Sequence, residues 1–311
     1  MDMIPTVDAS AVVSADVAPA RSPCCQGHAD CGVETACRPY PDRLPWLWKC
    51  DICGIQFSHP QPSEAELCMC YGPDYFQGFG AGKGAQETAY SAMKRHTFQR
   101  LFHLVHRFAA PGRLLDVGCG LGEALAVAES LGWKVRGIER IASAAERACS
   151  GIDGIVSITR FEDWGGSESR FDQVLLADVL EHLRDPFSAL ARTRELLVSG
   201  GIVVITTPNS ESLLAQIMRD RWFHYHRDHL WYFSKRALRQ ALISAGFSVL
   251  YSGHAFKTYT PRYIMNCLGM AAVPSILASA RQIEMVTPTA VLDYALPPLP
   301  DGMLFIAKCI T

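Results

Sequence analysis

The chain has 311 residues, of which 49% are hydrophobic and 19% are charged, and its formal net charge is −2. This composition is that of a globular protein with enough apolar side chains for a core, and the length predicts one large or two small domains. A net charge so close to zero lacks the excess of positive charge that is typical of nucleic-acid-binding proteins. The sequence does not open with a charged segment followed by an apolar run, so we expect a cytoplasmic protein.

Cysteines are concentrated in the first part of the chain. Of the 12 cysteines, eight lie before residue 71. Residues 1–22 are rich in Val, Ala, Ser, Pro and Asp without a period, and we expect them to form a flexible tail. In a chain without an export signal, clustered cysteines indicate a metal site rather than a disulfide framework.

The metal site is expected in a small module, residues 23–76. Cys50 and Cys53 form a Cys-x-x-Cys knuckle, and Gly54 lets the backbone turn so that both thiolates face one ion. Cys25 and His28 precede this knuckle at nearly the spacing of a zinc ribbon, which predicts a closed, structural Cys₃His zinc site. Other upstream cysteines could replace one ligand, namely Cys24, Cys31 and Cys37. A redox pair, or buried cysteines without a metal, is the alternative at the knuckle.

A strand, a glycine turn and a helix follow one another in residues 113–131. Gly118, Gly120 and Gly122 remove the side chains that would keep a ligand away from the backbone. A dinucleotide site has its third glycine one position later, and Glu123 at the helix start would repel a pyrophosphate. Asp116, two residues before the first glycine, suits the ammonium group of S-adenosylmethionine (SAM).

Polar residues also follow the later strands of the predicted sheet. Glu139 ends the second strand, 23 residues after Asp116, and its two carboxylate oxygens match the two hydroxyl donors of a ribose. Asp178 follows the fourth strand, at the edge where an open α/β sheet binds its ligands. The residues expected to bind the cofactor are Asp116, Gly118, Cys119, Gly120, Glu139, Arg140, Phe161, Glu162 and Asp178.

Two groups of motifs resemble a known family. Residues 113–124 resemble the first signature of the class I SAM-dependent methyltransferases, and residues 171–186 are similar to a later one. Residues 50–76 resemble the zinc-ribbon leader of a bacterial group of these enzymes, although His28 stands where that group usually has a cysteine. The resemblance implies an α/β fold, with a Rossmann-like seven-stranded sheet in residues 77–311 and a small N-terminal zinc ribbon. It also places Phe161 and Glu162 against the adenine of SAM.

The hydrophobic periodicity predicts alternating strands and helices in this larger part. The predicted strands cover residues 114–117, 133–139, 154–159, 174–177, 202–206, 247–252 and 301–308. The predicted helices cover residues 86–109, 123–131, 142–149, 187–197, 212–219 and 235–245.

Histidines and aromatic residues are dense in residues 222–234. The resemblance places this stretch over the substrate pocket, where a histidine can act as general base because its pKa lies near operating pH. His229 is the first candidate, ahead of His226 and His182. Two alternatives stay open: a second metal held by His224, His226 and His229, and a structural role in fixing the loop on the sheet.

Residues 256–298 are an insertion before the last strand. Pro274 interrupts its apolar stretch, residues 263–280, whereas a membrane span needs roughly 20 predominantly apolar residues. We therefore expect one or two amphipathic helices that cover the pocket or form a homodimer face. Contact with a membrane surface is the alternative.

The predicted activity is transfer of a methyl group from SAM to an oxygen, nitrogen or carbon nucleophile. The aromatic stretch and the apolar insertion favour a small acceptor, such as a natural product, a sugar or a lipid-like molecule, over a polynucleotide. Two other functions are compatible with the sequence. One is a catalytically silent zinc-ribbon module that senses SAM, and the other is an RNA methyltransferase that holds RNA with the ribbon.

Overall fold

The structure is a computed structural model of the chain. It describes residues 37–39, 44, 46–72, 75–78, 85–166, 170–270 and 287–310, and the statements that follow concern these residues.

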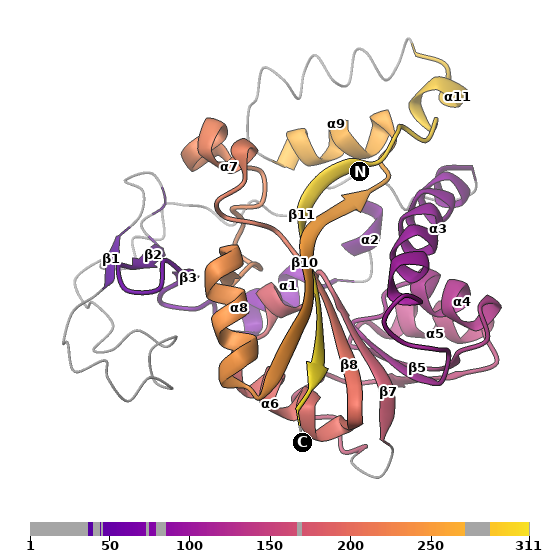
Figure 1. Cartoon of the computed structure of the whole chain (residues 1–311). Coiled ribbons are helices and arrows are strands. Elements are labelled where there is room, and N and C mark those ends of the chain that lie inside the picture. Colours follow the sequence, from indigo (N-terminus) through magenta and orange to yellow (C-terminus); the bar gives the residue numbers. More distant parts are fainter. Residues whose placement is uncertain are drawn as a thin grey trace.

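A seven-stranded sheet forms the centre of the molecule (Figure 1). Its strands, in spatial order, are β10 (Phe247–Lys257), β11 (Leu299–Cys309), β8 (Leu197–Thr207), β7 (Phe171–Ala177), β4 (Arg113–Val117), β5 (Lys134–Glu139) and β6 (Ile155–Ile158). Neighbouring strands from β8 to β6 pair in parallel, and β11 pairs antiparallel with both β8 and β10. The chain reverses its direction of winding between β4 and β7, which is where an open α/β sheet forms a ligand crevice.

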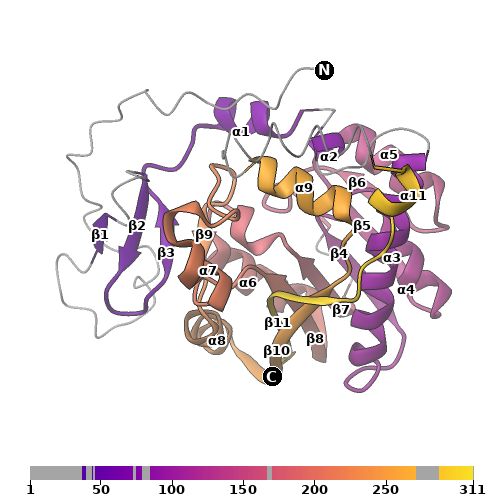
Figure 2. The ribbon, with the colours of Figure 1, turned by 90° about the horizontal axis from the view of Figure 1, so that it is seen from above.

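Helices cover both faces of this sheet (Figures 1 and 2). One face carries α3 (Ala85–Val105), α4 (Glu123–Ser130) and α5 (Ala142–Ser150), and the other carries α6 (Pro186–Leu196) and α8 (Lys235–Ser244). Successive strand residues point to opposite faces, so Leu114 and Leu175 pack in the first layer while Leu115 and Val174 pack in the second. Strands buried on both faces are continuous in apolar residues, which explains why the sequence pattern located them.

The predicted strands and helices of the larger sheet are confirmed. The antiparallel last strand is also present, and β8 and β10 extend beyond their predicted limits. Two helices start at serine caps. Ser234 accepts a hydrogen bond from the Ala237 N–H at the start of α8, and Ser63 forms a capping box with Glu66 at the start of α1 (Glu64–Cys70).

A second, smaller sheet contains strands from both predicted domains. Its strands, in spatial order, are β1 (Cys37–Pro39), β2 (Leu47–Cys50), β3 (Gln56–Ser58) and β9 (Trp231–Tyr232). Its strands β1 to β3 lie on the side of the large sheet that carries α6 and α8 (Figure 1), and Phe57 packs against Trp231. The N-terminal residues therefore share a sheet and a core with residues from the 77–311 part.

Short helices gather at the end of the large sheet where the parallel strands finish (Figure 2). They are α2 (Tyr75–Gly78), α7 (Leu213–Met218), α9 (Pro261–Met270) and α11 (Thr289–Leu292). α9 and α11 belong to the predicted insertion. None of the helices in the part of the chain that the structure describes is long and apolar enough to cross a membrane.

Candidate active site

A cavity of about 630 Å³ lies at the carboxyl ends of the parallel strands. Its lining falls into two groups. The glycine-turn side comes from the loops after β4 to β7 and includes Gly118, Cys119, Gly120, Glu139, Arg140, Phe161, Glu162 and Asp178. The histidine side includes Glu181, His182, His224, His226 and His229. Aromatic residues also line the cavity, namely Tyr71, Tyr75, Phe76, Tyr90, Tyr259 and Tyr263.

The glycine turn brings main-chain atoms to the cavity wall. Gly118 and Gly120 have positive φ angles of 68° and 55°, which favour glycine. A Cβ on Gly118 would lie 2.7 Å from Val179, and one on Gly120 would lie 3.3 Å from the Phe76 ring. The N–H groups of Gly118 and Cys119 both donate to the Ile138 carbonyl, at 2.7 and 3.0 Å. The turn is therefore held on β5 and leaves no room for side chains at its glycines.

Glu139, which is predicted to bind the ribose, is held in place by two main-chain hydrogen bonds. Its Oε2 accepts a hydrogen bond from the Gly120 N–H at 2.9 Å, and its Oε1 accepts one from the Ile141 N–H at 2.8 Å. Each carboxylate oxygen can accept a second hydrogen bond, so both remain able to receive a hydroxyl. Burial raises the pKa of Glu139, although these main-chain donors oppose the rise.

Asp116 occupies a different position from the other predicted cofactor residues. It is buried in β4 with 1% exposure, and it is not part of the cavity lining. Its Oδ1 has no hydrogen-bond partner among the described residues. Burial raises its pKa well above the usual range, and the carboxylates of Glu139 and Glu123 add to the rise. Both of these carboxylates, Glu139 and Glu123, line the cavity.

Asp178 forms an ion pair with Lys257, which the sequence did not predict. Lys257 at the end of β10 places its Nζ 2.9 and 2.8 Å from the two carboxylate oxygens of Asp178, and Thr206 donates to Oδ1 at 3.3 Å. Asp178 also has a positive φ of 56°. The ion pair fixes this carboxylate between the two sides of the cavity and neutralises its charge.

The histidine side is built by a loop that folds back on the end of β7. Leu230 donates its N–H to the Glu181 carbonyl at 2.7 Å, which brings His229 beside Glu181 and His182. The centre of the His229 ring lies 4.5 Å from the centre of the His182 ring and 3.7 Å from that of the His226 ring. The structure thus brings the three predicted catalytic histidines together on one wall.

Each of these histidines has a different set of partners. His182 Nδ1 lies 2.9 Å from both the Asp228 carbonyl and the Tyr71 hydroxyl. His226 Nδ1 forms a short contact with the Asp228 carboxylate. His229 is 6% exposed, and its Nδ1 has no hydrogen-bond partner among the described residues.

Burial and mutual repulsion keep two of the imidazoles neutral. Burial lowers the pKa of His229 well below its usual value, and the other histidines lower it further. Burial also lowers the pKa of His182. Glu181 is 1% exposed, and burial together with Asp178 raises its pKa well above the ordinary carboxyl range. Neutral imidazoles carry a free lone pair, so they can accept a proton or bind a metal ion.

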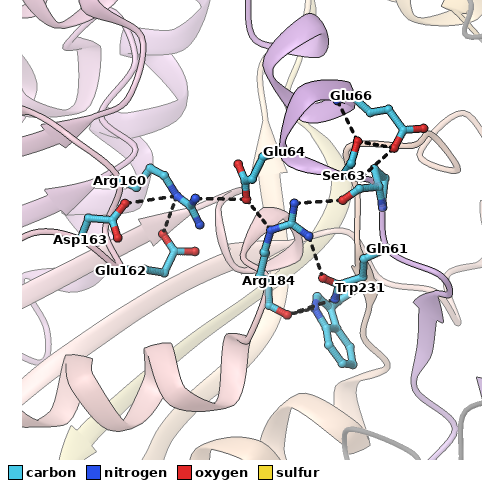
Figure 3. Close-up of polar contacts among 10 residues, drawn as sticks. Gln61, Ser63, Glu64, Glu66, Arg160, Glu162, Asp163, Arg184 and Trp231 are labelled. Carbon is cyan, nitrogen blue, oxygen red and sulfur yellow. Dashed lines mark hydrogen bonds and ion pairs between the residues drawn. The ribbon is translucent and has the colours of Figure 1, made fainter.

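The N-terminal segment forms part of the cavity wall, which the sequence did not predict. Glu64 at the start of α1 receives a hydrogen bond from Arg184 at 2.6 Å and lies 3.1 Å from Arg160 (Figure 3). Arg184 also donates to the Pro62 carbonyl at 2.9 Å, and Gln61 donates to the Arg184 carbonyl at 3.1 Å. Arg160 and Glu162 belong to the loop after β6, so these contacts fasten α1 to the glycine-turn side.

The metal ligands predicted in the N-terminal module are described only in part. Cys25 and His28 lie outside the described residues. Cys50 is buried at the end of β2, and Gly54 has a φ of 77° and donates its N–H to the Cys50 carbonyl at 2.9 Å. Cys37, one of the alternative ligands, is the direct register partner of Cys50 across β1 and β2. The turn expected of a knuckle is therefore present.

Comparison with known proteins agrees with this architecture. The methyltransferase domain family matches residues 93–252, just over half of the chain. Relatives include a ubiquinone biosynthesis O-methyltransferase of Cereibacter sphaeroides, 36% identical over 121 residues, which are 35% of this chain and 47% of the relative. One from Bradyrhizobium is 36% identical over 104 residues, with shares of 31% and 40%. The matches thus span about half the length of these relatives.

Solved structures show the same fold at low sequence identity. Magnesium protoporphyrin IX methyltransferase from Synechocystis, with bound SAH, is 14% identical and has a TM-score of 0.52, covering 79% of this chain and 100% of its own. The plantazolicin methyltransferase in complex with SAH is also 14% identical, with a TM-score of 0.51 and coverage of 79% and 94%. The chain therefore belongs to the methyltransferase domain family.

Proposed function

We propose that this enzyme transfers a methyl group from SAM to a hydroxyl oxygen of a small molecule that contains an apolar or aromatic part. The observation that carries the proposal is the two-sided cavity. One side has a glycine turn and the Glu139 carboxylate, the other has neutral imidazoles, and aromatic rings also line the cavity. Two ligands in one cavity can meet without crossing solvent, and alignment of the reacting atoms supplies much of the catalysis in such transfers.

The residues of the glycine-turn side fit SAM. The turn offers main-chain surface without Cβ atoms, and Glu139 offers two acceptors to the ribose. Arg140, Phe161 and Glu162 line the same side, where we assign them to the adenosine part. When bound, the cofactor supplies an electrophilic methyl group.

The histidines and the aromatic lining of the cavity fit an acceptor with an apolar body and one polar group. Tyr71, Tyr75 and Phe76 contribute aromatic surface from the N-terminal segment, and Tyr259 and Tyr263 contribute it from the insertion. We assign acceptor activation to His229, with His182 and Glu181 beside it and His226 as a neighbour. The O-methyltransferase names of the relatives support oxygen as the acceptor atom.

A labelled-methyl assay with the full-length chain tests the proposal. We expect transfer of the label to small hydroxyl-containing acceptors, and a fall in turnover of about 10²–10⁴-fold in His229→Ala with SAM affinity nearly unchanged. The exposed His103 on α3 provides the matched control, His103→Ala. SAM binding with label transferred only to amines, or with a stoichiometric protein partner and no turnover, would contradict it. Steeply salt-dependent RNA binding would instead favour an RNA substrate.

A further inference from the structure

Three side chains on the histidine side have the arrangement of a metal site. One ligand atom from each of Glu181, His182 and His229 lies within 4.8 Å of the other two. Two imidazole nitrogens and one carboxylate oxygen form a donor set found in catalytic zinc sites, which keep a fourth position open for water or substrate. The three residues line the cavity, so an open position can face the acceptor.

Two of these ligand atoms are buried without a partner. Glu181 Oε1 and His229 Nδ1 make no hydrogen bond to any described residue, and their side chains are 1% and 6% exposed. Buried polar atoms are almost always paired, because an unpaired one has lost its hydrogen bonds to water. Two such atoms in one cluster therefore indicate a ligand that both of them bind.

The remaining polar atoms of all three residues are held by neighbours. His182 Nδ1 lies 2.9 Å from the Asp228 carbonyl, and a carbonyl only accepts, so this nitrogen carries the proton and Nε2 has the free lone pair. The ring of His229 hydrogen-bonds the backbone of His224, which leaves Nδ1 as its free nitrogen. Thr207 donates to Glu181 Oε2 at 2.9 Å. Metal-binding histidines and carboxylates are oriented in this way by a second hydrogen bond.

A second group of possible ligands overlaps the first at His229. It consists of His224, His226 and His229. His226 Nδ1, however, already contacts the Asp228 carboxylate, and this group contains no carboxylate of its own. The set with Glu181 has the unpartnered oxygen and the negative charge that a cation needs. The positive charge of Lys257 nearby is balanced by Asp178.

We propose that Glu181 Oε1, His182 Nε2 and His229 Nδ1 bind one divalent transition-metal ion of the zinc type. Magnesium and calcium prefer sites made of oxygen ligands, so the two imidazoles select against them. One carboxylate leaves the ion with a net positive charge, which attracts an oxyanion to the open position. If the proposed function holds, an acceptor hydroxyl bound there loses its proton to solvent more readily, because a metal lowers the pKa of a bound oxygen.

Cobalt binding to the metal-free, full-length chain tests this site without any need for turnover. We expect Co²⁺ bound by these nitrogen and oxygen ligands to show ligand-field absorption bands but no thiolate charge-transfer bands. We expect Zn²⁺ to displace the Co²⁺. Glu181→Gln keeps the shape of the side chain and should abolish this signal, as should His229→Ala. His103→Ala should retain it. A thiolate-bound ion in the cysteine-rich module would show charge-transfer bands and would persist in Glu181→Gln.

The outcomes separate the metal from the proposed function. An unchanged cobalt spectrum in Glu181→Gln, with a normal circular dichroism spectrum, would overturn the metal site. Full turnover of the wild-type enzyme after exhaustive chelation would refute a role of the metal in activating the acceptor and would leave His229 as the proton acceptor. Metal bound at this site in an enzyme that methylates no hydroxyl acceptor would retain the site and refute the proposed function. Because Glu181→Gln is nearly isosteric, the test stands even if His229→Ala fails to fold.

Discussion

The hydroxyl of Tyr71 lies 2.9 Å from Nδ1 of His182, which joins the N-terminal segment to the end of β7 across 111 positions of the sequence. The guanidinium of Arg140, from the loop after β5, lies 4.3 Å from the centre of the same tyrosine ring. One side chain of the N-terminal segment therefore contacts both sides of the cavity. This segment is a structural part of the site, and its attachment should influence ligand binding.

The first prediction concerns that attachment. Arg184→Met removes the hydrogen bonds to Glu64 and to the Pro62 carbonyl while keeping the length of the side chain. We expect faster proteolytic cleavage within residues 61–76 and a higher KM for SAM, because α1 loses its contacts to the rest of the cavity wall. Limited proteolysis followed by mass spectrometry measures the first effect, and the exposed Arg239 on α8 gives the control Arg239→Met. Equal cleavage rates in the two variants would contradict the prediction.

The second prediction concerns Glu139 and the ribose. Glu139→Ala should weaken SAM binding by about 1.5–3 kcal/mol, the size of hydrogen bonds to a charged group. Glu139→Gln keeps the shape and removes the charge, so its loss should be smaller. Calorimetry with SAM and with SAH measures both variants, and Glu146→Gln on the exposed face of α5 serves as the control. An unchanged affinity in Glu139→Ala would remove Glu139 from the cofactor site.

The third prediction follows from the raised pKa of Glu139. Burial makes this carboxyl take up a proton at a higher pH than an exposed glutamate does. SAM should prefer the ionised form, so the free protein must lose that proton on binding, and the Kd should increase as pH falls through the raised pKa. Calorimetry over a series of decreasing pH values measures this dependence. Glu139→Gln should flatten the dependence, and an equally steep curve in that variant would assign it to another group.

Most of the fold could be predicted because local patterns and sheet geometry act together. A continuous apolar run such as residues 174–177 has only one environment that suits it, a strand covered on both faces. The glycine turn was equally readable, because positive φ angles at Gly118 and Gly120 need glycine. The carboxyl ends of parallel strands meet at one edge, which is why Glu139, Asp178 and His182 could be assigned to one cavity.

The unpredicted parts of the site depend on contacts between distant segments. Lys257 pairs with Asp178 because β11 places β10 near the cavity, and no local pattern marks that lysine. Tyr71 reaches His182 because β3 pairs with β9, a strand of two residues that is too short to recognise from periodicity. Asp116 was assigned to the cavity from its place before the glycines. Alternation along β4 turns its side chain into the protein interior instead.

The fourth prediction compares two glycines. At Gly118 a Cβ would lie 2.7 Å from Val179, and the φ of 68° strains any other residue, whereas nothing lies within 4 Å of a Cβ at Gly165. Gly118→Ala should therefore lower the free energy of unfolding by about 1–3 kcal/mol and weaken SAM binding. Gly165→Ala should leave both nearly unchanged. Denaturant titration and calorimetry measure the two effects, and equal behaviour of the variants would show that the turn tolerates side chains.

The last prediction concerns the metal expected in the N-terminal module. We expect elemental analysis of protein prepared without chelator to find a zinc ion that is lost in the Cys50→Ser, Cys53→Ser double variant and retained in Glu181→Gln. Its loss should also lower the thermal stability of residues 37–58, because a metal that binds only the folded state stabilises that state. Protein that contains no zinc when prepared in this way would refute the site.

Single variants then identify the upstream ligands. Cys37 is the register partner of Cys50 in the pairing of β1 with β2, so it is the first upstream candidate to test. If Cys37 is a zinc ligand, Cys37→Ser should release the zinc. Cys25→Ser and His28→Ala should release it only if those two residues are also zinc ligands. Cys149→Ser, at an exposed position on α5, is the control. Retention of zinc in Cys37→Ser together with its loss in His28→Ala would restore the Cys₃His arrangement with Cys25.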